Sequence, residues 1–181
     1  MAYLLRTLNI LMLVGVVITV LSALGAVEFT LNHIQLAIPV FIYTIFAQAF
    51  IMFYFIGVSR LVTNVYNILD STTNLKELFD QAPKDLQPYK TKVAKFVHDS
   101  TTCKRQTIPW TMLILILGMI AFLLGGAHDT GMVAKTTHSG VVYGFSGALL
   151  IGFYKQWIYL GKSHVLLRKI KALFSIPDGQ M

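Results

Sequence analysis

The sequence contains little charge and a single cysteine. Only 13% of its 181 residues are charged and 55% are hydrophobic, whereas roughly a quarter of the residues in a soluble domain carry charge. This composition excludes an ordinary water-soluble domain. The lone Cys103 excludes a disulfide within the chain, and with Thr102 and Lys104 beside it we expect this thiol to have no special role.

Catalytic motifs are missing as well. The sequence has no Walker-type glycine loop, no H-E-x-x-H, no C-x-x-C and no G-x-S-x-G. No ionisable residue lies deep in an apolar segment, which counts against a proton pump, an ion channel or a charge-coupled transporter. We therefore expect an accessory subunit more than an enzyme that acts alone.

Four long apolar segments are present, at about residues 4–26, 34–58, 110–126 and 139–159. A helix rises about 1.5 Å per residue, so each segment can cross most or all of a hydrocarbon core of about 30 Å. The first segment ends in small residues, as a secretory signal does, but it is longer than the apolar part of such a signal. The sequence predicts an all-α integral membrane protein. We expect one domain, 1–181, that is an antiparallel bundle of four transmembrane helices.

The positive charges lie almost entirely on one side of these segments. Fourteen of the fifteen Lys and Arg residues lie near the start of the first segment (Arg6), between the second and third segments, or from Lys155 near the end of the fourth segment onward; only Lys135 falls elsewhere. By the positive-inside rule both termini and the 59–106 connection are cytoplasmic, and a bacterial inner (plasma) membrane is the expected location. The same distribution explains the net charge of +7 without a nucleic-acid partner, which would require a basic face that follows phosphates.

Two cytoplasmic segments have helical patterns of their own. In the 59–106 connection Tyr89, Val93, Phe96 and Val97 share one helical face, which predicts an amphipathic helix on the membrane surface, against anionic headgroups; a protein partner is the alternative. The 160–181 tail looks similar.

Helix starts are also predicted in this part of the chain. Asn74 and Glu77 resemble a capping box that opens a short helix. Thr107 and Pro109 resemble the cap and first turn of the third span.

Polar residues gather in the two short connections on the outer side. Imidazoles and carboxylates are ligands that Zn, Cu or Fe prefer, so these residues form a candidate metal site, with solvated or hydrogen-bonded histidines as the alternative. The candidate ligands are Glu28, His33, His128, Asp129 and His138.

A second version of the site places b-type haem between His33 and His138, because these residues begin the second and fourth spans at one depth. Gly140 and Gly144 would make room for the flat ring. The competing explanation is close packing between helices at these glycines and at Gly147.

Gln48 is the most polar side chain near the middle of a span. A hydrogen bond from its amide to a neighbouring helix is expected, and a contact with a quinone or substrate is the alternative.

These observations favour a small polytopic subunit of a larger membrane complex, an oxidoreductase or electron-transfer assembly, which contacts the lipid bilayer and other membrane subunits. The cofactor would be a metal ion or b-type haem. The alternatives are a purely structural or assembly subunit without a cofactor, a stand-alone transporter or channel, and an enzyme acting alone on an apolar substrate.

Overall fold

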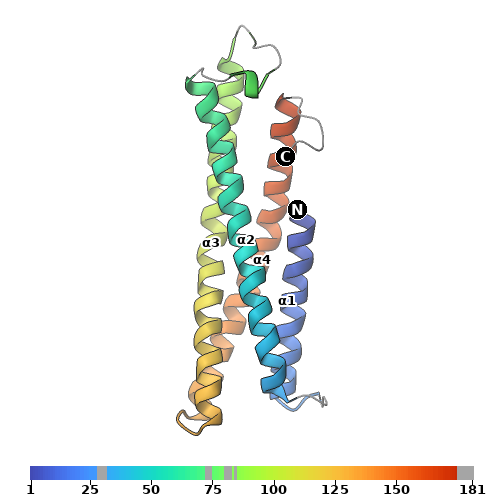
Figure 1. Cartoon of the computed structure of the whole chain (residues 1–181), viewed down its shortest axis with the longest axis vertical. Coiled ribbons are helices and arrows are strands. Elements are labelled where there is room, and N and C mark those ends of the chain that lie inside the picture. Colours follow the sequence, from blue (N-terminus) through green and yellow to red (C-terminus); the bar gives the residue numbers. More distant parts are fainter. Residues whose placement is uncertain (28–31, 72–74, 80–82, 84, 175–181) are drawn as a thin grey trace.

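The computed structural model describes residues 1–27, 32–71, 75–79, 83 and 85–174. All regular structure in these residues is helical: α1 (Ala2–Ala23), α2 (His33–Ser71), the short 3-10 helix η1 (Leu75–Glu77), α3 (Gln87–Asp129) and α4 (Lys135–Phe174). The helices run side by side along the long axis of the molecule (Figure 1). α3 packs on α2 and α4, and α1 packs on α2 and α4.

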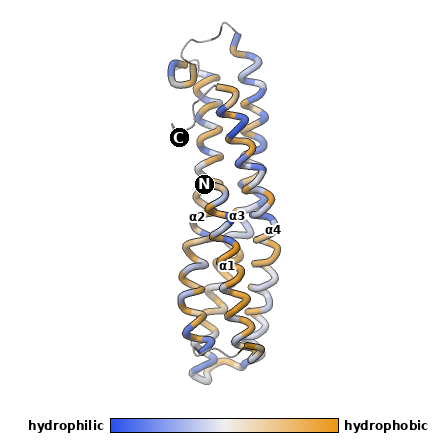
Figure 2. The backbone as a smooth tube through the Cα atoms, turned by 90° about the vertical axis from the view of Figure 1, so that its right-hand side faces the viewer, coloured by the Kyte–Doolittle hydropathy of each residue, from blue (hydrophilic) through white to orange (hydrophobic). Residues whose placement is uncertain are grey.

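The bundle has two halves with different make-up. α1 has 22 residues and covers one half only, whereas α2, α3 and α4 have 39, 43 and 40 residues and continue past it. We call the end where α1 ends and α2 and α4 begin the turn end, and the part of α2, α3 and α4 beyond α1 the extension. Hydrophobic residues dominate the half that contains α1, and polar residues are frequent in the extension (Figure 2).

Three helices, α1, α2 and α3, are long and apolar enough to cross a membrane. This is the composition of a membrane protein. α4 has Gly, Ser and Tyr residues interspersed among its apolar residues, and its expected span stays a prediction.

Apart from the short η1, the described residues of the 59–106 connection belong to the two long helices on either side of it. α2 continues to Ser71, and α3 begins at Gln87 and runs without a break into the third apolar segment. The tail from Ser163 to Phe174 is likewise the end of α4. The expectation of surface helices was wrong because an apolar stripe at helical spacing can be buried by another helix of the same chain as well as by lipid.

The stripes of the extension pack against one another. Val93 is fully buried, with Tyr89, Phe96 and Val97 partly buried beside it. Phe79 packs edge-on against Tyr89, with ring centroids 5.0 Å apart. The buried residues of this core are Val58, Val62, Val65, Leu69, Leu78, Val93, Leu166, Ile170 and Phe174.

The helix start predicted at Thr107 and Pro109 was wrong. Pro109 lies in the middle of α3, and Thr107 does not cap a helix: its Oγ1 donates to the carbonyl oxygen of Cys103 at 2.8 Å. An interior proline costs a helix about 3 kcal/mol, which the packing of α3 on two neighbours offsets. Asn74 lies outside the described residues, and Glu77 ends η1.

A polar layer crosses the core of the half that contains α1. Gln48 and Gln156 are fully buried, and Gln156 Nε2 donates to Gln48 Oε1 at 2.7 Å and to Thr111 Oγ1 at 3.0 Å. Gln48 Nε2 approaches Met12 Sδ at 3.1 Å. The Gln48 amide, expected to bond to a neighbouring helix, therefore has partners on α1 and α4, and Gln156 extends the layer to Thr111 on α3.

Cationic side chains mark the boundary between the two halves. Arg6 Nη2 donates to the carbonyl oxygen of Trp157 at 3.0 Å, and its guanidinium lies 4.7 Å from that indole ring. Lys155 Nζ donates to Gln106 Oε1 at 2.8 Å. The part of α1 from Arg6 to Ala23 is about 26 Å long at 1.5 Å per residue, close to the thickness of a hydrocarbon core.

Candidate functional site: a cavity at the turn end

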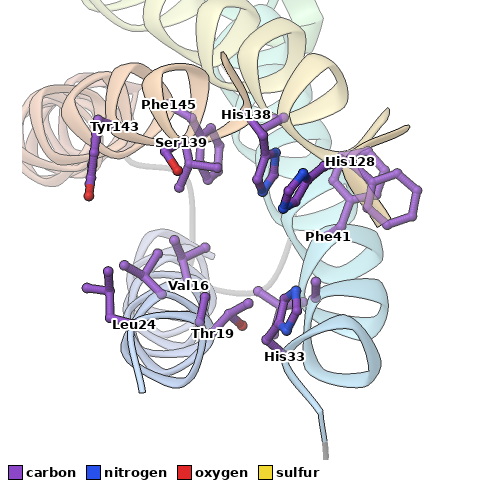
Figure 3. A pocket seen from close by; sticks show the side chains of 18 of the residues that line it. Val16, Thr19, Leu24, His33, Phe41, His128, His138, Ser139, Tyr143 and Phe145 are labelled. Atoms are coloured by element: carbon purple, nitrogen blue, oxygen red, sulfur yellow. The ribbon is translucent and has the colours of Figure 1, made fainter. Parts of the chain in front are cut away.

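A cavity of about 620 Å³ lies among all four helices at the turn end. Its size is within the range of about 300–1,000 Å³ that is usual for ligand pockets. Side chains from every helix line it (Figure 3). The polar lining residues are Thr19, His33, Thr44, His128, Asp129, Lys135, His138, Ser139 and Tyr143.

The three histidines expected to converge all line this cavity. His128 and His138 lie together, with ring centroids 6.0 Å apart and ring planes 15° from parallel. His33, at the start of α2, lies across the cavity from both rings (Figure 3). Asp129 lines the same cavity, while Glu28 lies outside the described residues.

His138 belongs to α4, and its ring packs against α3 at Gly125. Its Cε1 lies 3.2 Å from the position that a Cβ on Gly125 would occupy, and both ring nitrogens lie 3.8 Å from it. Its Nδ1 is buried without a hydrogen-bond partner among the described residues. The nitrogen-bearing edge of the ring therefore faces α3, and in this rotamer His138 does not present a nitrogen across the cavity to His33, as axial ligation of a haem iron would require.

His128 is held by the turn that follows α3. Its Nδ1 lies 3.1 Å from the carbonyl oxygen of Val133. A carbonyl oxygen only accepts, so Nδ1 carries the proton in this bond and the Nε2 of the neutral ring keeps its lone pair. His128 is thus an oriented hydrogen-bond acceptor in the wall of the cavity.

Aromatic rings form an apolar wall. Phe41 of α2 and Phe122 of α3 are stacked, with centroids 4.5 Å apart and planes 8° from parallel. Phe145 of α4 is buried and packs against Gly118, where an added Cβ would lie 3.1 Å from the phenyl ring. Flat aromatic surfaces of this kind favour a ligand with a planar ring.

The described part of the expected metal site is not a preformed metal centre. Among the residues that the structure describes, no group of three or more His, Cys, Asp or Glu side chains is placed to hold a metal ion. The stacked arrangement of His128 and His138 separates two potential ligands instead of directing both to one point.

The glycines expected to pack against another helix face away from the bundle. A Cβ on Gly140, Gly144 or Gly147 would meet nothing within 4 Å, so no described helix of this chain covers them. A contact with another chain stays a prediction. Close helix contacts occur at Gly118, Gly125 and Gly152 instead.

Sequence reasoning missed Gly125, Phe41 and Phe122. Phe41 and Phe122 resemble ordinary core residues of apolar segments, and only the packing of α2 on α3 brings them together. Gly125 is one of many glycines, and its proximity to His138 follows from the tight turn between α3 and α4. Lys135 could have been singled out from the sequence, because it is the one Lys or Arg on the outer side of the predicted topology. In the structure it lines the cavity.

No protein-family model matches the chain, and comparisons with curated proteins and with solved structures found no match either.

Proposed function

We propose that this chain is a small membrane subunit of a larger oxidoreductase assembly and that its cavity binds a quinone or the corresponding quinol. The observation that carries the proposal is a cavity of about 620 Å³ whose walls combine a stacked aromatic pair with histidines on opposite sides. In this proposal all four helices cross the membrane, and the turn end lies on the outer side.

The topology is supported by the chemistry of the two ends. Arg6 and Lys155 lie at the boundary with the extension, where cationic side chains and Trp157 suit the headgroup region. α4 begins beside the end of α3 and packs on it. If α3 crosses the membrane, α4 therefore crosses it as well. The extension, rich in Lys and Arg, is then cytoplasmic.

The shape and polarity of a quinone suit this site. A quinone has a flat ring with oxygen atoms on opposite edges and an apolar tail. Phe41 and Phe122 supply an aromatic wall, and His33 lies across the cavity from His128. The Nε2 lone pair of His128 can accept a hydrogen bond from a quinol hydroxyl.

The reaction of a quinol explains why a partner subunit is needed. Oxidation of a quinol to a quinone releases two protons and two electrons. In this proposal His128 Nε2 accepts the proton of one hydroxyl, and the imidazole of His33 across the cavity accepts the proton of the other. The sequence has no metal or flavin motif to receive the electrons, so they pass to a redox group on another subunit.

The binding proposal can be tested by titrating the purified protein with a short-tailed benzoquinol. Replacing His128 by Ala removes one hydrogen bond and should raise the Kd about tenfold, which corresponds to about 1.4 kcal/mol. His98→Ala is the matched control, because His98 is an exposed histidine of the extension on the same helix, and its Kd should equal that of the parent.

Two results would overturn the proposal. One is equal affinity of the parent, His128→Ala and His98→Ala. The other is a Soret band in the visible spectrum of the purified protein that disappears in His33→Ala and in His138→Ala, since such a band would identify haem as the occupant.

The topology is tested by labelling single cysteines in intact cells with an impermeant maleimide. Cys103 is a poor reporter because it is only 5% exposed and burial raises the pKa of its thiol. In a Cys103→Ser background, Met132→Cys at the exposed α3–α4 turn should react, and Lys92→Cys on the extension should react only after lysis. The reverse pattern would contradict the orientation.

A further inference from the structure

The cavity at the turn end has one side that its flanking helices do not close. α1 and α4 touch near the extension, where Arg6 Nη2 donates to the Trp157 carbonyl at 3.0 Å and the rings of Tyr3 and His164 are 5.4 Å apart. At the turn end, residues of the same two helices line the cavity from opposite sides. α1 and α4 are therefore joined at one end and separated by the cavity at the other.

Leu24 and Tyr143 mark the two edges of this opening. Leu24 is the C-cap of α1 and Tyr143 lies in the third turn of α4, and both line the cavity although each is 62% exposed. Figure 3 shows them on the same side of the cavity, one on each helix, with no labelled side chain between them. The cavity thus reaches the lateral surface of the bundle between α1 and α4.

The helix face around Tyr143 carries only small residues. Its neighbours three and four positions away on the surface of α4 are Ser139, Gly140, Ser146 and Gly147. A Cβ on Gly140 or Gly147 would meet nothing within 4 Å. The helix surface beside the phenol ring is therefore low and open.

The opening lies at the depth of apolar residues. It extends along α1 from Leu24 to Val16, which is about 12 Å at 1.5 Å per residue. The outward face of α1 at this level is hydrophobic, with Val17 and Leu21 exposed, and on α4 Leu150 and Ile151 are exposed about two turns further toward the extension. In the proposed topology the opening faces the lipid acyl chains of the outer leaflet and not bulk water.

We propose that the ligand of the cavity enters sideways from the outer leaflet of the membrane, between α1 and α4 and past Tyr143. The ligand is accordingly a membrane-dissolved amphiphile whose ring reaches the histidines while its tail remains between the helices or in the lipid. The identification of that amphiphile as a quinone rests on the proposed function; the lateral opening rests on the geometry of α1 and α4.

The opening itself is tested without a quinone. In the Cys103→Ser background, Thr19→Cys carries a small bimane fluorophore inside the cavity, and Met132→Cys carries the same label at the turn as the control. In vesicles, lipids with a nitroxide on the acyl chain should quench the Thr19→Cys label more than twofold better than they quench the control. Aqueous iodide should do the opposite. Stronger iodide quenching at Thr19→Cys than at the control would show a water-filled opening and overturn the inference.

Entry of the ligand through the opening is tested by closing the opening with a chemical cross-link. In the Cys103→Ser background, Leu24→Cys and Tyr143→Cys joined by a bifunctional methanethiosulfonate reagent, which forms a disulfide with each thiol and releases sulfinate, should slow association of a vesicle-dissolved quinone at least tenfold. Reduction of the linker should restore the rate that the double variant had before treatment. Each single variant is the control, and its association rate should be the same before and after treatment with the reagent. Unchanged association in the joined variant would overturn lateral access while leaving quinone binding intact. Lipid quenching in a protein that binds no quinone would overturn the proposed function alone.

Discussion

Gly152→Leu should destabilise the bundle by about 3 kcal/mol or more, because this glycine is where α4 comes closest to α3. A Cβ at Gly152 would lie 2.5 Å from Ile114 Cδ1 and 3.5 Å from the Cβ of Trp110. Overpacking of a filled core costs about 1–3 kcal/mol for smaller insertions, and a leucine adds three further carbons beyond the Cβ. The midpoint of unfolding in detergent, followed by circular dichroism, measures the effect.

Gly144→Leu is the matched control on the same helix. A Cβ there meets nothing within 4 Å, so the stability of the isolated chain should change by less than about 0.5 kcal/mol. If the two variants unfold at the same midpoint, the orientation of α4 in the structure is wrong. A Gly144→Leu chain that is stable alone but no longer co-purifies with partner subunits would place the glycine face in an interface between chains.

The second large effect is expected in the polar layer. Gln48→Leu leaves the Gln156 amide without its partner on α2, and Gln156→Leu leaves the Gln48 carbonyl oxygen without its donor on α4. A buried polar group left unpaired costs about 1–3 kcal/mol. Each single variant should therefore lower the free energy of unfolding by about 2 kcal/mol.

The double variant Gln48→Leu/Gln156→Leu separates pairing from the loss of side-chain volume. Because it removes both partners, its cost should fall short of the sum of the two single costs by about 1 kcal/mol or more. Denaturant titration of the three variants and the parent completes the cycle. Strict additivity would show that the 2.7 Å bond contributes nothing to stability.

The membrane class and the end at which the histidines gather could be predicted from the sequence. Apolar runs of this length have few other uses, and the short connections bring the starts of α2 and α4 to the same end of an antiparallel bundle. His33, His128 and His138 consequently line one cavity. Their ring orientations could not be predicted, since these depend on local contacts such as the place that Gly125 leaves for His138.

The extension shows that an apolar pattern does not determine which surface will bury it. The stripe formed by Tyr89, Val93 and Phe96 gives the buried face of a helix but not the surface that buries it. Lipid, another protein and the chain itself all satisfy the same spacing. The glycines at 140, 144 and 147 are ambiguous in a similar way. A helix face without side chains can pack closely against another helix, or it can leave an open path for a ligand.

The unbroken length of α4 has a mechanical consequence. A helix of 40 residues is about 60 Å long, and in this chain one end of it borders the cavity while the other forms part of the core of the extension. A stiff rod of that length, tilted by about 3° at one end, moves the other end by about 3 Å. In the proposed topology, filling or emptying a cavity beside the first turns of α4 would thus displace Ile170 and Phe174 on the opposite side of the membrane.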